Sequence, residues 1–248
     1  MQRLSYWQYI LALLCVAIVC PLSAQQSLVS ASIATPSPEK SQLYFTPNVG
    51  QWTDDNPCIA QAVVPGGAVF ITESGLRILT EAPENIQRKH QIHHFRGKDT
   101  QFTLAYHVTN LQFLQAQKPS NILFQDLASW KENYFLGHEI HRWQSVTPAK
   151  KVILKNLYPG IDIAIYFHQQ SLEFDWIIHP GADPSVIGLE VDNQSQLSLL
   201  KNTLYVQTSV GQFQINPPKA FQKLPLKSKI QRVTCGYRVN NNTIQLQL

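Results

Sequence analysis

The sequence carries little charge and no strong excess of either sign. Its 248 residues include 20 lysines and arginines and 16 aspartates and glutamates, which gives a net charge of +4. Residues 1–24, interpreted below as a cleaved leader, contain only Arg3 as a charged residue, so the remaining chain carries 19 − 16 = +3. Proteins that bind nucleic acid or anionic membranes usually carry dense clusters of basic residues. This charge balance therefore argues against both as partners.

Apolar runs long enough to cross a bilayer are also missing. The longest run, residues 10–20, has 11 residues, about half of the ~20 that a spanning helix needs. Arg3 precedes the run, and the small residue Ala24 follows it. This arrangement is typical of a secretory signal peptide. The sequence thus predicts a cleaved signal peptide over residues 1–24 and no integral membrane segment afterwards. The mature chain is expected at the outer-membrane surface, outside the cell or in the periplasm.

Cysteine is scarce once the predicted signal peptide is removed, because Cys15 and Cys20 lie within it. Cys58 and Cys235 remain, and neither has a C-x-x-C or Cys/His spacing typical of redox or zinc chemistry. In an oxidising, exported setting the two can form a disulfide that ties the first strand region to the last. The alternative is two buried thiols that act as small hydrophobic residues.

No stretch of a dozen residues shows the apolar stripe of a helix. Residues 25–42 are rich in Ser, Gln, Ala and Pro and predict a flexible leader. From residue 43 onward, short apolar runs of period two alternate with turn residues. Residues 43–248 are therefore predicted to be all-β, an antiparallel β-sandwich built as one large or two small sandwich-like units, with the subdivision near 125–145. Strands are expected at 59–64, 68–72, 76–80, 102–108, 161–168, 171–178, 186–191, 204–208, 212–215, 231–239 and 243–248.

Residues 102–108 alternate apolar and other side chains, which indicates a strand with one buried face. The residues expected in the core are Phe102, Leu104, Tyr106 and Val108. Those expected on the opposite face are Thr103, Ala105 and His107.

The most informative segment is residues 161–178, IDIAIYFHQQSLEFDWII. If Gln169 and Gln170 form a two-residue turn, residues whose numbers sum to 339 face each other across a hairpin. One face then holds the apolar pairs Phe167–Leu172, Ile165–Phe174, Ile163–Trp176 and Ile161–Ile178. The other face holds Asp162, Tyr166, Glu173 and Asp175. A shift by one residue would move the apolar row into water, so the register is well specified.

Several short motifs together resemble a known family. They are FTPNVGQW (45–52), VPGGAVFIT (64–72), NYFLG (133–137) with Trp143 following, LYPGIDI (157–163), LEFDWIIHPGADP (172–184) and TSVGQF (208–213). Their order and spacing are similar to an N-terminal domain of unknown function in large exported proteins of the Bacteroidota. In such proteins the domain commonly precedes SBBP-type repeats or accompanies a gliding-motility-associated C-terminal domain of the type IX secretion system. The resemblance implies this location and context, and it implies no catalytic residues.

The sequence departs from that family pattern in two places. The family usually has a glycine in the turn that is Gln169–Gln170 here, and its domain runs on into a strand ending near LVIDP, which would follow Leu248. The resemblance therefore leaves open a stand-alone copy, a split reading frame or a fragment.

Acidic residues give the best enzyme hypothesis. Glu173 and Asp175 share one strand face roughly 7 Å apart, a separation that glycoside hydrolases use for an acid and a base. Asp162 would lie nearby on the partner strand. Charged residues on the outer face of a half-solvated sheet give the same geometry without chemistry. These three residues are a weak candidate face, and no catalytic activity is predicted.

No cofactor or metal is predicted either. The histidines fall in two groups, which are His90, His93 and His94 in a polar loop, and His138 and His141. A solvated loop explains them better than preorganised ligands. Asp162 and Asp183 offer oxygens that suit calcium, but aspartate beside Gly or Pro is also ordinary turn chemistry.

Aromatic residues and nucleophile motifs complete the survey. No G-x-S-x-G elbow or glycine-rich phosphate loop is present. Trp52, Tyr134 and Trp143 form either an aromatic platform for glycans or part of the core.

The sequence as a whole predicts a non-catalytic, exported β-sandwich module with a structural or adhesive role in gliding or surface assembly. Its expected partners are other surface proteins or glycans. The alternative is a carbohydrate-active enzyme or carbohydrate-binding module that uses the face of Asp162, Glu173 and Asp175.

Overall fold

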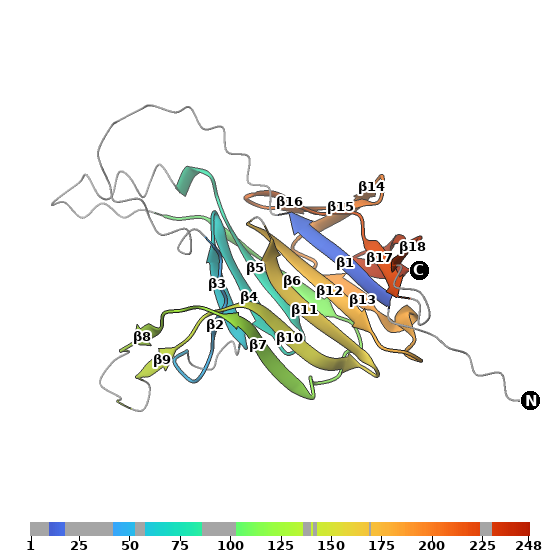
Figure 1. Cartoon of the computed structure of the whole chain (residues 1–248). Coiled ribbons are helices and arrows are strands. Elements are labelled where there is room, and N and C mark those ends of the chain that lie inside the picture. The colour runs from blue at the N-terminus through green and yellow to red at the C-terminus, as the bar shows by residue number, and fades with distance from the viewer. Residues whose placement is uncertain are drawn as a thin grey trace, which may run out of the picture.

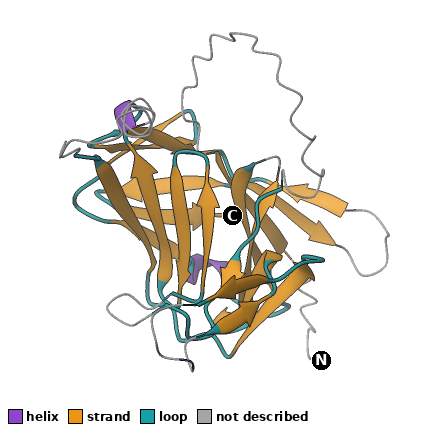
Figure 2. Ribbon diagram, turned by 90° about the vertical axis from the view of Figure 1, so that its left-hand side faces the viewer, coloured by secondary structure: helices purple, strands orange, loops and turns teal. Residues whose placement is uncertain are grey.

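The computed structural model describes residues 10–17, 42–52, 58–85, 103–135, 140, 143–168, 170–223 and 230–248. Nearly all secondary structure in these ranges is β-strand, which confirms the all-β prediction. Two antiparallel sheets pack against each other as a sandwich, and a short two-stranded ribbon stands beside them (Figures 1 and 2). Of the predicted leader at 25–42, only Gln42 lies within the described residues.

The first sheet has eight strands in the order β19-β20-β13-β6-β5-β4-β3-β2. Their bounds are β2 (Thr46–Pro47), β3 (Ala60–Val64), β4 (Gly67–Thr72), β5 (Gly75–Glu81), β6 (Tyr106–Phe113), β13 (Gly188–Val191), β19 (Gly236–Asn240) and β20 (Thr243–Gln247). The predicted meander over residues 59–80 is confirmed as β3, β4 and β5. Gly66 makes the first turn with φ of +77°, a backbone conformation that favours glycine.

The second sheet has ten strands. Its main path runs β14-β15-β16-β1-β12-β11-β10-β7, and β17 pairs with β1 and β18. The bounds are β1 (Ile10–Ala17), β7 (Asn121–Leu127), β10 (Ala149–Tyr158), β11 (Ile161–His168), β12 (Ser171–Ile178), β14 (Gln196–Leu200), β15 (Thr203–Thr208), β16 (Gly211–Ile215), β17 (Lys219–Lys223) and β18 (Ile230–Val233). The separate ribbon consists of β8 (Glu132–Tyr134) and β9 (Gln144–Val146).

The β11–β12 hairpin has the predicted register. All four apolar pairs whose numbers sum to 339 are formed, from Ile161–Ile178 to Phe167–Leu172. His168 pairs with Ser171, which leaves a two-residue turn at 169–170. Of the eight apolar side chains, seven are buried in the core and Phe167 is partly buried against it.

One hydrophobic cluster fills the space between the sheets. Trp176 is its largest fully buried side chain, and its ring lies 5.6 Å from that of Phe113 in the eight-stranded sheet and 5.8 Å from that of Tyr158. Burial of a large side chain of this kind stabilises the fold by about 3 kcal/mol. Phe45 and Leu246 belong to the same cluster, so residues on both sides of the predicted subdivision share one core.

The two sheets are joined at one corner by Phe45 and Ala149. Each residue's N–H donates to the other's carbonyl oxygen, at 2.7 and 2.8 Å. The Phe45 ring stacks on Phe167 with centroids 4.7 Å apart. This contact places the chain entering β2 beside the turn end of the β11–β12 hairpin.

The predicted faces of the strand at 102–108 are wrong. Tyr106 and Val108 are 41% and 37% exposed, whereas His107 and Thr109 are 7% and 1% exposed. The reason lies further along β6, where Leu111 and Phe113 are buried in the core. Because side chains alternate along a strand, these two residues place every odd-numbered residue of β6 on the inner face.

The predicted strand at 231–239 is also corrected. It is two strands, β18 and β19, which belong to different sheets. The chain passes from the ten-stranded to the eight-stranded sheet between Val233 and Gly236. Period-two alternation cannot reveal such a crossing, because both strands have the same pattern.

The apolar part of the predicted signal peptide forms β1. This strand pairs with β12 on one side and with β16 and β17 on the other. Removal of residues 1–24 during export stays a prediction.

Candidate functional site

The acidic face predicted from the sequence lies on the outer side of β11 and β12, and Asp162 is its most enclosed member. The Asp162 side chain accepts hydrogen bonds from Lys155 Nζ and, at 2.8 Å, from His179 Nε2, both at Oδ2. Its other oxygen accepts the Asn156 backbone N–H at 2.7 Å. Asp162 is only 2% exposed. Both carboxylate oxygens therefore serve local structure.

The pKa of Asp162 shows which effect dominates there. Burial alone would raise this pKa, but the hydrogen bonds from Lys155, the Asn156 backbone and His179 outweigh burial, and the pKa is lowered. A carboxylate held in its charged form by three donors is poorly suited to give or take a proton near neutral pH.

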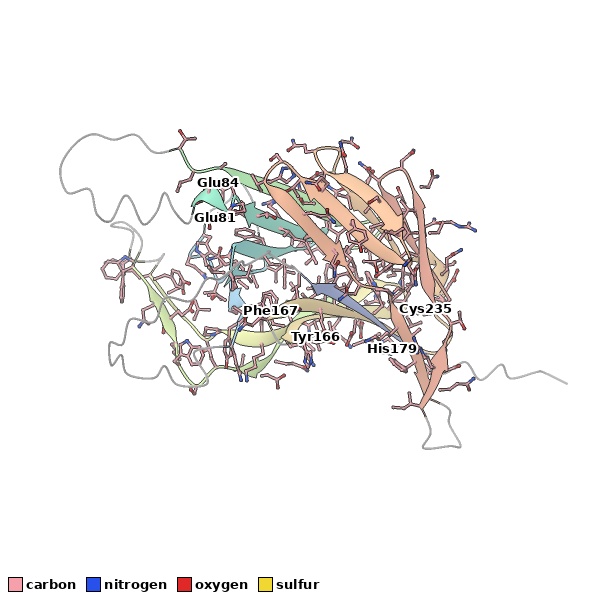
Figure 3. All side chains as sticks on the ribbon, turned by 90° about the horizontal axis from the view of Figure 1, so that it is seen from above. Glu81, Glu84, Tyr166, Phe167, His179 and Cys235 are labelled. Carbon is pink, nitrogen blue, oxygen red and sulfur yellow. The ribbon has the colours of Figure 1, made fainter. Side chains whose placement is uncertain are left out.

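Glu173 and Asp175 lie on β12, opposite Tyr166 and Ala164 of β11. Tyr166 Oη donates to Asp175 Oδ2 at 3.0 Å, and Lys151 Nζ lies 5.1 Å from the Tyr166 ring centroid. The positions of Tyr166 and His179 along the sheet can be followed in Figure 3. Glu173 is 8% exposed, so this face is more enclosed than the half-solvated sheet expected.

Asp175 is the most perturbed acid of the face. Burial raises its pKa most, the Tyr166 hydrogen bond lowers it, the negative charge of Glu173 raises it and Lys151 lowers it, and the net result is a pKa of about 6. Burial and the neighbouring carboxylates also raise the pKa of Tyr166. A carboxyl group with a pKa near 6 beside a second carboxyl group has the electrostatics of a general acid. Among the described residues, it is the feature that favours the enzyme alternative.

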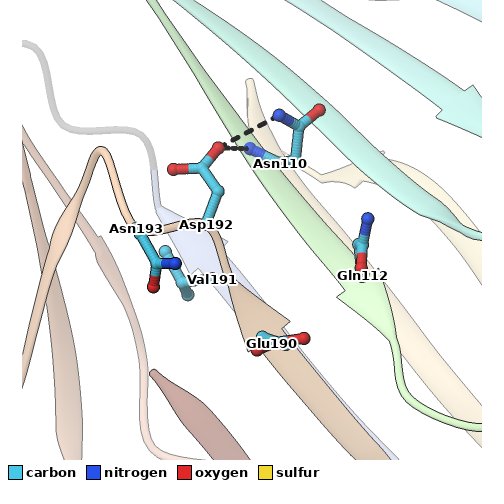
Figure 4. Close-up of a pocket in the computed structure, with 6 residues that line it drawn as sticks. All are labelled: Asn110, Gln112, Glu190, Val191, Asp192 and Asn193. Atoms are coloured by element: carbon cyan, nitrogen blue, oxygen red, sulfur yellow. Dashed lines mark hydrogen bonds between the residues drawn. The ribbon is translucent and has the colours of Figure 1, made fainter. Parts of the chain in front are cut away.

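A shallow polar cavity of about 210 Å³ lies elsewhere, over β6 and β13 (Figure 4). It is lined by Asn110, Gln112, Glu190, Val191, Asp192 and Asn193. Asp192 Oδ2 accepts the Asn110 backbone N–H at 2.6 Å and its side-chain amide at 3.0 Å. Arg77 Nε donates to Asn110 Oδ1 at 3.2 Å. Asp192 and Asn110 are thus already paired with each other, and Asn110 also with Arg77.

A second cavity, of about 270 Å³, lies between the 3-10 turn η3 (Pro184–Val186) and β20. Neither cavity is lined by Asp162, Glu173 or Asp175.

A buried polar network that the sequence analysis missed lies on the inner side of β6. His107 Nδ1 is 2.9 Å from Ser209 Oγ, and its Nε2 is 3.1 Å from Ser195 Oγ. Thr109 Oγ1 is also 3.1 Å from Ser195 Oγ. Extending the alternation from residue 108 to the apolar Leu111 would have placed His107 on the inner face.

The network contains serine, histidine and aspartate, but not in the roles of a catalytic triad. Asp192 Oδ1 accepts from Ser195 Oγ at 3.4 Å, and the ring nitrogens of His107 are bonded to the two serines, whereas a triad requires the carboxylate to orient the histidine. Ser195 is 3% exposed, so a substrate carbonyl has no access to its hydroxyl. The geometry favours a structural role.

The two cysteines of the predicted disulfide are separate free thiols in this structure. Burial raises the pKa of both Cys58 and Cys235, and Cys235 Sγ donates to Pro218 O at 3.1 Å. Raised thiol pKa values lower the fraction of reactive thiolate.

The metal hypotheses have little support in the described ranges. His90, His93, His94, His138 and His141 all lie outside them. Asp183 accepts the Ser185 backbone N–H at 2.9 Å as the cap of η3. Among the described residues, no three His, Cys, Asp or Glu side chains gather as metal ligands would.

Aromatic side chains cluster around the β8–β9 ribbon. Trp52 and Tyr134 pack edge to face with centroids 5.6 Å apart, and Phe135 and Trp143 do so at 5.4 Å. Phe135 is 69% and Trp143 is 43% exposed. Tyr134 and Trp143 thus belong to a partly exposed aromatic surface and not to the main core.

Comparisons with known proteins give one match. A family model described as a domain of unknown function, DUF7948, matches residues 45–248. No curated protein and no solved structure gives a match. In the part of the chain that the structure describes, no helix has the length and apolar character required to cross a membrane.

Proposed function

The chain belongs to the DUF7948 family of domains of unknown function, and from that premise we propose that it is a non-catalytic, exported β-sandwich module that takes part in cell-surface assembly or adhesion. The signal-peptide pattern of residues 1–24 supports export. The same proposal places the module in the surface architectures of Bacteroidota that the sequence motifs suggest.

One observation carries the non-catalytic part of the proposal, namely how the acidic face uses its carboxylates. Asp162 has both oxygens bound by Lys155, Asn156 and His179, and Asp175 is bound by Tyr166. A glycoside hydrolase needs two carboxyl groups free to reach a sugar from opposite sides. Here Asp162 and Asp175 each accept a hydrogen bond from a residue on a neighbouring strand.

The aromatic surface at β8–β9 supports an adhesive role. Phe135, Ile140 and Trp143 are 69%, 72% and 43% exposed. Exposed aromatic side chains are enriched in surfaces that bind proteins, because they bury large areas at little entropic cost. Glycans also stack on such rings.

The second candidate function is a carbohydrate-active enzyme, and the raised pKa of Asp175 beside Glu173 favours it. Enzymatic activity is tested with three proteins, the wild type, Glu173→Gln and Asp175→Asn, each incubated with a panel of polysaccharides. The expected result is no release of reducing sugar by any of them. Hydrolysis by the wild type that either variant abolishes, with an unfolding midpoint no lower than that of the wild type, would establish the enzyme.

Adhesion is tested on the same protein immobilised on beads. Binding of surface extracts or glycans should fall at least fivefold in Trp143→Ala. It should stay unchanged in Glu190→Ala, because Glu190 lies on β13 of the eight-stranded sheet. Equal binding by both variants would remove the β8–β9 surface from the proposal.

A further inference from the structure

One strand in the interior of the ten-stranded sheet comes from the segment that export is predicted to remove. β1 pairs with β12 through seven residue pairs, from Ile10–Ile178 to Val16–Leu172. Its other edge pairs with β17 and then with β16. Among the described strand pairings, β1 alone connects β12 to β16 and β17. Figure 1 shows β1 running between these neighbours.

Removal of residues 1–24 would open this position from both sides. The vacated space would be bounded by the edge of β12 and by the edges of β16 and β17, about two strand spacings, or ~9.6 Å, apart. Both edges would then present unpaired backbone N–H and C=O groups, which template the addition of another strand. We name this space the acceptor slot.

The acceptor slot also lies over the centre of the core. The β1 positions 10, 12, 14 and 16 stand opposite residues of β12 that are at most 3% exposed, namely Ile178, Trp176, Phe174 and Leu172. Paired positions of neighbouring strands share a face, so these four positions belong to the core side of the sheet. A strand that fits the slot must therefore be apolar at four alternate positions.

The opposite face adds a polar requirement. Asp175 Oδ1 is buried and has no hydrogen-bond partner among the described residues. Position 13 of β1 pairs with Asp175 on one side and with Lys219 on the other. Leucine occupies this position in β1 and can donate no hydrogen bond, so β1 leaves the carboxylate unsatisfied, a condition that costs about 1–3 kcal/mol.

We propose that in the exported protein the acceptor slot binds one extended strand of a polypeptide different from this chain, antiparallel to β12. That strand carries apolar residues at the four core positions and a hydrogen-bond donor opposite Asp175. The inference rests on the proposed function through the removal of residues 1–24. It gives the surface-assembly role a physical mechanism, because strand addition joins two chains through backbone hydrogen bonds and alternate side-chain contacts.

The chain's own leader is a poorer occupant. Its best alternating window, residues 28–35, has Val29, Ala31 and Ile33 on one row, and the fourth position of that row is Thr35. The other row contains Ser30 and Ser32. Neither row supplies four apolar residues, which favours a strand from another chain.

The test uses the full chain with Cys58→Ser, Cys235→Ser and Glu173→Cys. The protein is secreted by means of its predicted signal peptide, residues 1–24, and is purified after that segment has been removed. The probe is a peptide with the sequence of residues 10–17 in which Leu11 and Leu13 are replaced by threonine, flanked by lysines for solubility. Its cysteine is activated as a disulfide with thionitrobenzoate, so that the protein thiolate attacks the peptide sulfur and releases the thionitrobenzoate anion without an external oxidant. Its cysteine, equivalent to Cys15, stands opposite Glu173 in the register of β1. Paired Cβ atoms at this spacing allow a disulfide after small adjustment.

The expected result is a mixed disulfide that forms at least tenfold faster than with a matched protein carrying Glu190→Cys on β13 of the other sheet. Moving the peptide cysteine to position 13 should transfer the reaction from Glu173→Cys to Asp175→Cys. In the protein without added cysteines, the peptide should slow hydrogen exchange of the β12 backbone, and a peptide with leucine restored at position 13 should bind several-fold more weakly.

Four outcomes would overturn the inference. The first is a processed, monomeric protein whose β12 backbone is already protected from hydrogen exchange and whose added cysteine does not react with the peptide. In that case residues 25–42 fill the slot, or β12 pairs directly with β16 and β17. The second is a dimer that excludes the peptide, because the occupant is then a second copy. The third is aggregation that the peptide does not prevent. The fourth is an intact mass that retains residues 1–24, which also contradicts the export part of the proposed function. The first three leave that function standing.

Discussion

The two sheets of the sandwich bury polar side chains in different ways. In the ten-stranded sheet, the carboxylate of Asp162 is enclosed with two basic partners, Lys155 and His179. In the eight-stranded sheet, His107 is enclosed with the hydroxyl groups of Ser195 and Ser209. The first arrangement concentrates charge at one atom, whereas the second distributes hydrogen bonds over groups that can donate or accept.

This difference predicts unequal sensitivity to mutation. A buried carboxylate whose partners remain leaves behind unpaired basic groups when it is removed. A hydroxyl–imidazole network loses hydrogen bonds of ordinary strength and can be replaced by apolar side chains of similar shape with little loss.

The largest effect is expected at Asp162. Asp162→Ala should lower the free energy of unfolding by about 1–3 kcal/mol, because Lys155, His179 and the Asn156 backbone N–H lose their shared acceptor; water solvates the first two in part, since they are 36% and 38% exposed. Chemical denaturation at pH 7 measures this. Asp183→Ala, which removes an exposed cap, is the matched control and should lose much less stability than Asp162→Ala. Equal losses in the two variants would contradict the structural role of Asp162.

The pH dependence of the same variant has a defined sign. The folded-state pKa of Asp162 is lowered, through hydrogen bonds that outweigh burial. Its contribution is therefore complete above the unfolded pKa near 3.9 and is lost as the pH falls through the lower folded value. The stability difference between wild type and Asp162→Ala should shrink below pH 4.

The next largest effect is expected at His107. His107→Ala should destabilise the protein by about 1–2 kcal/mol, because the buried Ser195 loses one of its hydrogen bonds, whereas the exposed Ser209 can bind water instead. The double variant His107→Leu with Ser195→Ala should recover part of this loss. Thermal unfolding of the single and double variants measures the coupling, and additive losses would show that the three groups are not one network.

How much the sequence could predict differs between these same regions. In β11 and β12, the row of eight apolar residues and a short turn leave one register, and the structure has it. In β6, a window ending at Val108 gives the wrong face, because the deciding residues, Leu111 and Phe113, follow it. A histidine such as His107 can be buried when hydroxyl groups bind its ring nitrogens. A single sequence does not show that Ser195 and Ser209, about a hundred residues away, are those partners.

The candidate site was less predictable than the fold. Residue spacing placed Glu173 and Asp175 on one face correctly, and it could not show that Tyr166 binds Asp175 or that Lys155 binds Asp162. Lys155 lies on β10, a strand that the alternation analysis did not identify. Partners on neighbouring strands decide whether a carboxylate is free, and only the sheet order supplies them.

Asp175 provides a smaller test, of opposite sign to Asp162. Burial raises its folded pKa to about 6, so the folded state binds the proton more tightly than the unfolded state. Its ionisation therefore lowers stability as the pH rises from about 4 to 6. Asp175→Asn should stabilise the protein by about 1–2 kcal/mol at pH 7.5, less than the full shift implies because the side chain is partly exposed, and should not do so at pH 4. Unfolding curves at the two pH values measure this, and a variant that is destabilised at both would contradict it.

The smallest effect compares one hairpin turn from each sheet. Gln170 in the ten-stranded sheet and Asn241 in the eight-stranded sheet both have positive φ, 67° and 53°. Left-handed backbone disfavours residues with a Cβ by roughly 1 kcal/mol, but asparagine tolerates it far better than glutamine. Gln170→Gly should therefore raise the unfolding midpoint by about 2–4 °C, the shift that ~1 kcal/mol produces in a chain of this size, and Asn241→Gly should leave it nearly unchanged. Equal shifts would mean that the turn conformation contributes no strain at Gln170, and that the added backbone entropy of glycine in the unfolded chain determines both results.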